Sequence, residues 1–266
     1  LTVLVVNGAV LSGIEVRSCT GFRLTGSTIV MRDESGPWPG VFACCIDGLI
    51  ERNTITIDGF GAVNPETGIP IPIAAGRGGL QLGGLSVNIR VINNLIQGGI
   101  GNGITLGSLA QVDENGNILI ALLAWVVNAW DPCDPCAPGS TYPQPSDDEE
   151  QGPRYESAGA LFNIRIENNR ILDMGLNGIG LPMFFNLDEE DEMISVDGLE
   201  ILGNTIRNCL YRDLELIPDN MANSMGYGGI ALADVEDLAV YDNLIENNGF
   251  DHLQPVCGIF ILHGEG

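Results

Sequence analysis

Apolar and polar positions along the chain follow a phrase that recurs: an asparagine, one residue of any kind, then an isoleucine. Five copies and one weaker copy begin at Asn53, Asn94, Asn169, Asn204, Asn243 and Ser27. The residues three and five positions before this residue are apolar in almost every copy, and Gly, Asp or Asn stands six positions before it. Apolar residues two apart behind a turn residue predict a short strand with one buried face. The Gly, Asp and Asn column predicts left-handed turn backbone.

A second phrase, in which glycine is followed by apolar, variable and apolar residues, alternates with the first. Its copies begin at Gly13, Gly79, Gly103, Gly178, Gly229 and Gly258, with a poorer copy at Gly40. Where loops are short, the glycine stands 13 to 15 residues before the next asparagine and 9 after the previous one. One repeat is therefore about 23 residues long and contains three short strands and three turns.

One such coil has no second layer against which to bury its apolar side. Stacking coils about 4.8 Å apart closes one continuous core and places like residues above one another. The pattern therefore predicts a buried amide ladder inside a turn, in which each asparagine bonds to the next. Its members are Asn53, Asn94, Asn169, Asn204 and Asn243.

These two phrases resemble those of the right-handed parallel β-helix repeat superfamily, typified by pectate lyases and phage tailspikes. The resemblance covers nearly the whole chain outside its insertions. It implies an all-β fold: a single-stranded, right-handed parallel β-helix, or solenoid, of about seven coils with loop insertions. The glycine phrase looks like the superfamily's first strand, the apolar pair before Asn like its second, and the Asn like the turn before its third. Because this superfamily includes lyases, hydrolases, epimerases and inert spikes, the resemblance implies no single chemistry.

The single register of the repeat predicts one β-helix domain over residues 1–266. We expect it to be a fragment of a longer chain, because both ends fall in mid-pattern and a solenoid end needs a cap. Four insertions interrupt the repeat, at residues 60–78, 107–160, 182–195 and 210–228. The longest, a loop insertion at 107–160, contains a hairpin turn at 111–117 that enters a strand at 118–120. We expect these insertions to form the side walls of a groove over the first-strand face.

The net charge of the chain limits the classes of partner that it is expected to bind. The chain has 11 Lys plus Arg, all of them Arg, against 35 Asp plus Glu, a net charge of −24. A field of that sign repels nucleic acid and anionic membranes at ordinary salt, so we expect no nucleic-acid partner. The most apolar run, 118–127, is too short for a membrane span. No cofactor is indicated except calcium, for which the weak candidates are Asp188, Glu189 and Asp191. Such a contiguous run is more typical of a solvated charged surface.

The 7 cysteines leave two questions open. Cys19 and Cys45 both lie eight residues before the aligned Ser27 or Asn53, in an inward column, which favours packed thiols over a disulfide. Cys133 and Cys136 have the spacing of a metal knuckle, but a zinc site needs two more ligands. A disulfide within the loop is the favoured interpretation there.

We expect alternate residues of the glycine phrases to face outward and to floor a ligand-binding groove. The candidate groove residues are Phe42, Gln81, Thr105 and Phe260, with the loop aromatics Trp125, Trp130, Tyr211 and Tyr227. These rings could stack on sugars or could pin their loops to the core. The floor lacks the opposed carboxylates of a glycoside hydrolase. The weak catalytic candidates nearby are Asp234, Glu236, Asp237 and Arg212.

Three functional hypotheses follow. The favoured one is an extracellular or cell-surface module, rigid and non-catalytic, that binds polysaccharide or a partner protein as a surface or spike component. The second is a polysaccharide lyase or glycoside hydrolase that acts in the groove over the first-strand face. The third is a structural subunit of a larger particle or filament, in which the chain is part of an oligomer or larger assembly.

Overall fold

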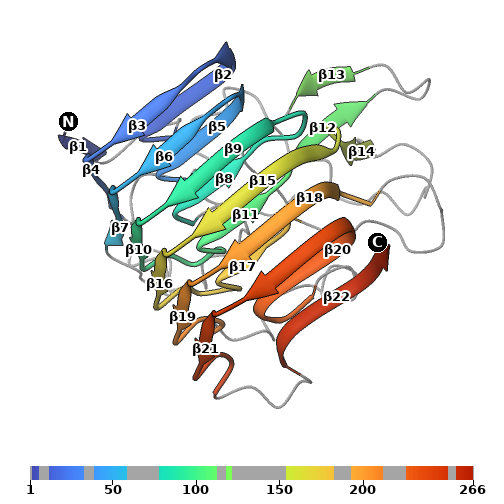
Figure 1. Cartoon of the computed structure of the whole chain (residues 1–266). Helices are drawn as coiled ribbons and strands as arrows, with labels where there is room; N and C mark the ends of the chain where they lie inside the picture. Colours follow the sequence, from blue (N-terminus) through green and yellow to red (C-terminus); the bar gives the residue numbers. More distant parts are fainter. Residues whose placement is uncertain are drawn as a thin grey trace, which may run out of the picture.

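The computed structural model describes nine stretches of the chain and contains strands but no helix in them. These stretches are residues 2–5, 12–32, 39–58, 78–112, 118–121, 154–182, 193–211, 226–250 and 256–265. Parallel strands form three long faces that run from the N-terminal to the C-terminal end (Figure 1). The predicted parallel β-helix is thereby confirmed.

Each face consists of one strand per coil. The first-strand face contains β2 (Ile14–Thr20), β5 (Val41–Ile46), β8 (Leu80–Leu82), β11 (Ile104–Leu106), β17 (Ile179–Gly180), β20 (Gly228–Tyr241) and β22 (Cys257–Glu265). The second-strand face contains β3 (Arg23–Thr25), β6 (Leu49–Glu51), β9 (Val87–Ile92), β15 (Leu161–Glu167), β18 (Ser195–Leu202) and the later part of β20. The third-strand face contains β1 (Thr2–Val5), β4 (Thr28–Arg32), β7 (Thr54–Asp58), β10 (Leu95–Gln97), β16 (Arg170–Leu172), β19 (Thr205–Arg207) and β21 (Leu244–Glu246).

Two strands continue around the corner between the first and second faces. β20 pairs with β17 through Ile230 and with β18 through residues 234–241. β5 likewise pairs with β8 and, at Ile46, with β9. The two faces therefore share one sheet, which closes into a ring of eight strands in the order β5-β8-β11-β17-β20-β18-β15-β9.

The pairing register follows the repeat seen in the sequence. The residues that come directly after each asparagine, or after Ser27, pair with one another from coil to coil: Thr28, Thr54, Leu95, Arg170, Thr205 and Leu244. Six complete coils run from β2 to β21, with β1 before them and β22 after them. The predicted number of about seven coils is correct.

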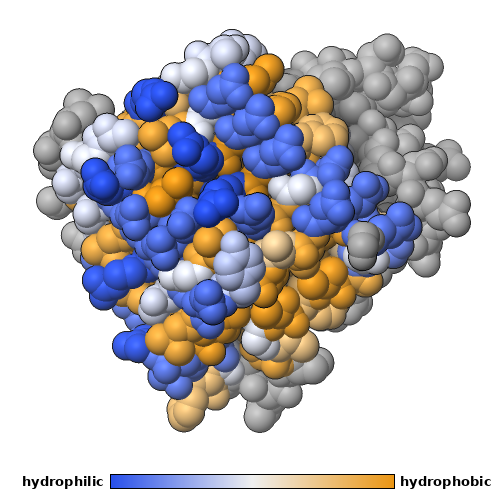
Figure 2. Space-filling view, viewed as in Figure 1, coloured by the Kyte–Doolittle hydropathy of each residue, from blue (hydrophilic) through white to orange (hydrophobic). Residues whose placement is uncertain are grey.

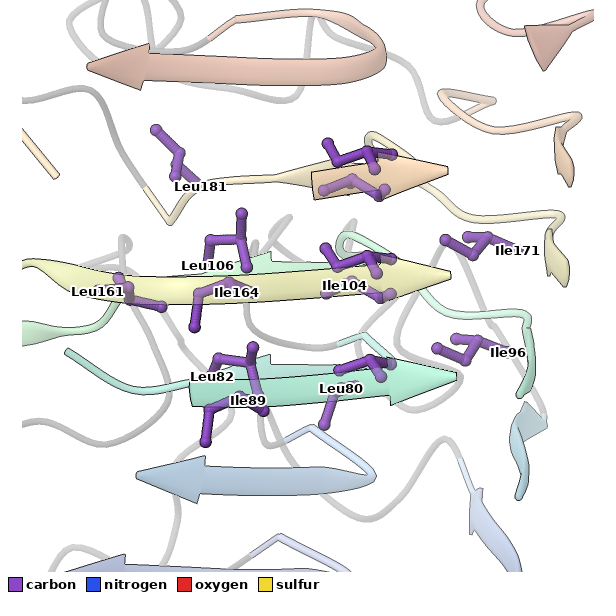
Figure 3. Close-up of a cluster of buried hydrophobic side chains, with 14 of the residues drawn as sticks. Leu80, Leu82, Ile89, Ile96, Ile104, Leu106, Leu161, Ile164, Ile171 and Leu181 are labelled. Carbon is purple, nitrogen blue, oxygen red and sulfur yellow. The ribbon is translucent and has the colours of Figure 1, made fainter. Parts of the chain in front are cut away.

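Aliphatic side chains fill the interior of the helix. Leu82, Leu106 and Ile164 point inward from the first and second faces, and Ile96 and Ile171 point inward from the third (Figure 3). All five have exposed fractions of 0% or 1%. Like residues stack on like residues in successive coils, so the core is continuous along the helix axis.

The glycine of one sequence phrase packs against the isoleucine of the other phrase within each complete coil. A Cβ atom built on the first glycine of a coil would meet Cγ2 of the isoleucine in the third strand of the same coil. At Gly40, for example, this atom would lie 2.7 Å from Ile55 Cγ2 and 3.0 Å from the carbonyl oxygen of Gly79. The glycines that make this contact are Gly13, Gly40, Gly79, Gly103, Gly178 and Gly229. Glycine recurs here because no larger side chain fits beside the isoleucine.

The asparagine amides form a buried ladder along the corner before the third strands. Each Oδ1 accepts hydrogen bonds from the backbone N–H and from Nδ2 of the asparagine one coil earlier, at 2.9–3.0 Å. Each Nδ2 also donates to a backbone carbonyl of the earlier coil, as Asn169 does to Val91 at 2.8 Å. Asn53, Asn94, Asn169 and Asn204 are 1% or 2% exposed. The ladder therefore satisfies the backbone of a buried turn.

Left-handed backbone recurs at two corners of every coil. The Gly, Asp and Asn column before the second strands has φ between 48° and 74°, as predicted, at Gly21, Asp47, Asn88, Asn163, Gly198 and Asp237. The residue before each ladder position is also left-handed, with φ between 53° and 63°, although one member is Arg52. The turn geometry, rather than residue preference alone, sets this second column.

The longest insertion contributes a three-stranded antiparallel sheet. Its strands are β12 (Leu109–Val112), β13 (Ile118–Ala121) and β14 (Arg154–Ser157), in the order β13-β12-β14. β12 and β13 confirm the predicted hairpin, whereas β14 was not predicted. Among the described residues, no helix is long and apolar enough to cross a membrane.

Candidate functional site

The residues predicted to floor a groove over the first strands are buried. The exposed fractions are 1%, 0% and 1% for Phe42, Gln81 and Thr105. Gln81 Nε2 donates to the Gly107 carbonyl at 2.8 Å, and the N–H of Gly84 donates to Ser108 Oγ at 3.0 Å. The start of the 107–160 insertion therefore lies against this face instead of walling it. Phe42, Gln81 and Thr105 are therefore not accessible on the surface of this face.

The other predicted aromatic residues do not gather at one site. Phe260 is partly buried and packs against the core. Tyr227 is partly buried, and burial raises the pKa of its phenol to about 12. Trp125 and Trp130 lie outside the described residues. Tyr211 is exposed, at a different corner of the helix.

The candidate catalytic carboxylates all lie on β20, and Arg212 lies outside the described residues. Asp234 Oδ1 is 2.8 Å from Nδ1 of His263, and this hydrogen bond raises the pKa of the imidazole. Glu236 pairs in register with Asp197 and Glu265, both of them also acidic. Asp237 occupies a left-handed turn. Of these three carboxylates, only Asp237 lines the surface groove on the second-strand face.

The metal candidates receive no structural description. Asp188, Glu189, Asp191, Cys133 and Cys136 all lie outside the described residues. Among the residues that are described, no three His, Cys, Asp or Glu side chains gather as metal ligands would.

Two cysteines stack in neighbouring coils, as the repeat predicted. Cys19 and Cys45 are direct partners in the pairing of β2 with β5, and both are free thiols in this structure. Cys45 is 3% exposed, and burial, with a further contribution from Cys19, raises the pKa of its thiol to about 12. Burial also raises the pKa of the Cys209 thiol to about 12.

We expect Cys45 and Cys209 to resist alkylation in the folded protein, whereas the exposed Cys257 reacts. The thiolate is the reactive form, so a raised pKa and burial both slow the reaction at about pH 8. Iodoacetamide labelling followed by peptide mass spectrometry measures each site, and labelling in denaturant provides the control. Labelling of Cys45 as fast as Cys257 would contradict the packing of its column.

An open groove of about 670 Å³ lies on the second-strand face instead. Its floor is one column of outward-facing residues that pair from coil to coil: Arg23, Leu49, Arg90, Arg165, Glu200 and Ala239. Figure 2 shows hydrophilic surface over this face, where β6, β9 and β15 turn toward the viewer in Figure 1. The groove therefore runs along the helix axis and crosses the coils.

The left-handed turns form one wall of the groove. Asn88 Nδ2 donates to Asp47 Oδ1 at 2.9 Å, and Asn163 Nδ2 donates to Asn88 Oδ1 at 3.1 Å. Gly198 interrupts this exposed ladder because glycine has no side chain to continue it, and a Cβ there would lie 2.8 Å from Asn163 Oδ1. The wall thus presents amide and carboxylate groups in a row, with a gap before Asp237.

The charges on the groove floor differ along its length. Arg165 bonds Glu167 at 2.9 Å and Glu200 at 2.6 Å, and the Glu167 hydrogen bond raises the pKa of the guanidinium. Arg23 and Arg90 form no ion pair with any described residue. In the N-terminal half of the groove these two arginines outnumber the one carboxylate, that of Asp47, within a chain whose net charge is −24.

Sequence reasoning missed this groove because it examined only the outward residues of the first strands. The signal was present, since Arg23, Arg90 and Arg165 all stand four residues before a ladder position. Three of 11 cations in a single column are unusual for a chain with so few. The stacking register converts that column into a row on one face.

No family model and no curated protein sequence matches the chain. The fold is thus established by the strand pairing, and the function has to be argued from the groove.

Proposed function

We propose that the protein is a non-catalytic β-helix module that binds an anionic polysaccharide along its second-strand groove. The observation that carries the proposal is the row of Arg23, Arg90 and Arg165 on the floor of an open groove of about 670 Å³. We place the module outside the cell or on its surface, where polysaccharides are met. The proposal includes the superfamily resemblance, namely that the fold is a right-handed parallel β-helix of the pectate-lyase and tailspike kind.

The dimensions of the groove suit an extended polymer. Its floor extends from Arg23 in the first complete coil to Ala239 in the sixth. Five coil spacings of about 4.8 Å give a length of about 24 Å. Each coil offers one floor residue and one turn residue, so an extended polymer meets one such pair of positions at every coil. A linear polysaccharide has this repeating character.

The chemical groups suit a carboxylate-bearing sugar chain. Guanidinium forks match the two oxygens of a carboxylate, and the amides of Asn88 and Asn163 can donate to or accept from hydroxyls. Arg90 and Arg165 are direct cross-strand neighbours, but Arg165 is already paired with Glu167 and Glu200. Arg23 and Arg90 are therefore the guanidinium groups that a bound carboxylate would pair with. The net charge of −24 opposes binding at long range, but salt screens it beyond about 8 Å at physiological ionic strength.

The carboxylates of the groove support binding rather than catalysis. Of the three carboxylates that line the groove, Glu200 is held by Arg165 and Asp47 accepts a hydrogen bond from Asn88. Asp237 is the third, and a single remaining acid does not make the opposed pair that glycoside hydrolysis needs. The enzymatic alternative is tested directly by incubating the protein with acidic and neutral polysaccharides and assaying reducing ends and unsaturated products.

We expect Arg90→Ala to weaken binding of a uronate polysaccharide about 10- to 100-fold, because a hydrogen bond to a charged group contributes about 1.5–3 kcal/mol. Titration calorimetry with oligogalacturonate or oligoalginate measures the affinity. The matched control is Arg170→Ala, because Arg170 is an exposed arginine on the third-strand face without an ion pair to any described residue.

Three results would contradict the proposal. Binding that Arg170→Ala weakens as much as Arg90→Ala does would place the ligand elsewhere. Equal affinity for the same oligosaccharides after their carboxyl groups are reduced would remove the role of charge. Failure of every polysaccharide in the set to bind would reject the module function itself.

A further inference from the structure

A second, uncharged cavity of about 350 Å³ lies at the corner that follows the third strands. We propose that this cavity is a separate binding site for the pyranose ring of a neutral sugar. It faces a different side of the helix from the groove and contains different chemistry. The inference therefore stands without the proposed function.

The stacking register brings two pairs of side chains together here. β19 and β21 pair with Arg207 opposite Glu246, so the residues that follow run in step on adjacent coils. The N–H of Gly249 donates to the Cys209 carbonyl at 2.9 Å, which holds the two turns together. Asn208 and Asn247 therefore occupy equivalent positions on adjacent coils, as do Tyr211 and Phe250, and all four line the cavity.

The two aromatic rings provide an exposed platform. Phe250 is 85% exposed and Tyr211 is 46% exposed. Exposed aromatic surface costs hydrophobic free energy that a ligand ring can recover by covering it. Tyr211 Oη donates to the Gly99 carbonyl at 3.2 Å, so this ring is held in place before any ligand arrives. A fixed aromatic face loses little conformational entropy on binding.

The two amides supply hydrogen bonds beside the rings. Asn208 and Asn247 both have φ of 55°, so both side chains leave the same kind of left-handed turn one coil apart. Asn208 Nδ2 donates to Asp173 Oδ1 at 3.1 Å, which orients that amide. A pyranose ring has apolar C–H faces for the aromatic rings and hydroxyls around its edge for the amides.

The lining indicates the charge of the ligand. The six residues that line the cavity (Asn208, Cys209, Leu210, Tyr211, Asn247 and Phe250) carry no charged side chain. A charged ligand would leave water for a site without a counter-charge, which is unfavourable. The net charge of −24 disfavours an anion further. A neutral sugar meets neither penalty.

The test is a titration of the full chain with neutral oligosaccharides of glucose, mannose and galactose, followed by calorimetry and saturation-transfer NMR. We expect Phe250→Ala to weaken the binding about tenfold, by the loss of one stacked ring. The matched control is Phe162→Ala, because Phe162 is 38% exposed on β15, outside the cavity. Arg90→Ala, in the groove, should leave the affinity for neutral sugars unchanged.

Several outcomes would overturn this inference. The inference is wrong if no neutral oligosaccharide binds, or if Phe162→Ala weakens sugar binding as much as Phe250→Ala does. It is also wrong if an uncharged peptide containing Phe and Leu binds with higher affinity and displaces the sugar. Loss of neutral-sugar binding in Arg90→Ala would also overturn it, because one site would then serve both ligands. If anionic polysaccharide fails to bind while neutral sugar binds and requires Phe250, only the proposed function is rejected.

Discussion

Replacing Asn169 by alanine is expected to lower the free energy of unfolding by about 3–5 kcal/mol, because it leaves two buried donors without an acceptor at about 1–3 kcal/mol each. Those donors are the backbone N–H and Nδ2 of Asn94, each 2.9 Å from Asn169 Oδ1. The carbonyl of Val91 and Oδ1 of Asn204 also lose the donor Nδ2. Water cannot replace these bonds, since Asn94 and Asn169 are 2% and 1% exposed.

Equilibrium unfolding in urea measures the loss, and Asn243→Ala is the matched control. Asn243 makes the same bonds toward the earlier coil, but it is only partly buried. Because Asn243 itself is partly exposed, its removal opens the N–H and Nδ2 of Asn204 to water, although Asn204 is 1% exposed in the intact protein. We therefore expect a loss of about 1 kcal/mol. Equal losses at both positions would show that burial does not set the contribution of the ladder.

The fold was predictable from the sequence because stacking repeats the same demand in every coil. The ladder position must supply both a donor and an acceptor to a buried turn, and Asn53, Asn94, Asn169 and Asn204 meet that demand. The inward positions must be apolar for the core to close. Each requirement therefore recurs as the same residue type at the same position of the repeat, and six coils make that recurrence detectable in the sequence.

The candidate site was less predictable because the outward positions obey no shared demand. Sequence reasoning placed the groove over the first strands, where Gln81 and Thr105 are instead buried and Gln81 bonds Gly107 at the start of the 107–160 insertion. The repeat pattern contains no information on how an insertion packs against the coils. The arginine column of the second strands was visible, but its meaning depended on knowing which face stays open. Trp125 and Trp130 lie outside the described residues, so their predicted place in the groove stays a prediction.

Replacing Gly178 by alanine is expected to lower the free energy of unfolding by about 3 kcal/mol, the upper part of the usual range for overpacking a core. The new Cβ would overlap Cγ2 of Ile206 and would lie 2.8 Å from the Gly229 carbonyl oxygen. Ile206 is 0% exposed and is stacked between like residues of the coils on either side, so it has no space into which to move. The carbonyl belongs to the next coil, so relief there would disturb the parallel pairing.

A double-mutant cycle with Ile206→Ala identifies this clash as the cause. Ile206→Ala removes Cγ2 and is itself destabilising, but in that background the added cost of Gly178→Ala should fall by at least about 1 kcal/mol. Gly258→Ala is the control at the equivalent position of β22, because a Cβ there meets no heavy atom within 4 Å. We expect it to change stability by no more than about 0.5 kcal/mol. Since only the glycines opposite an isoleucine carry the penalty, additive effects in the cycle would mean that the glycine column serves the backbone rather than the contact.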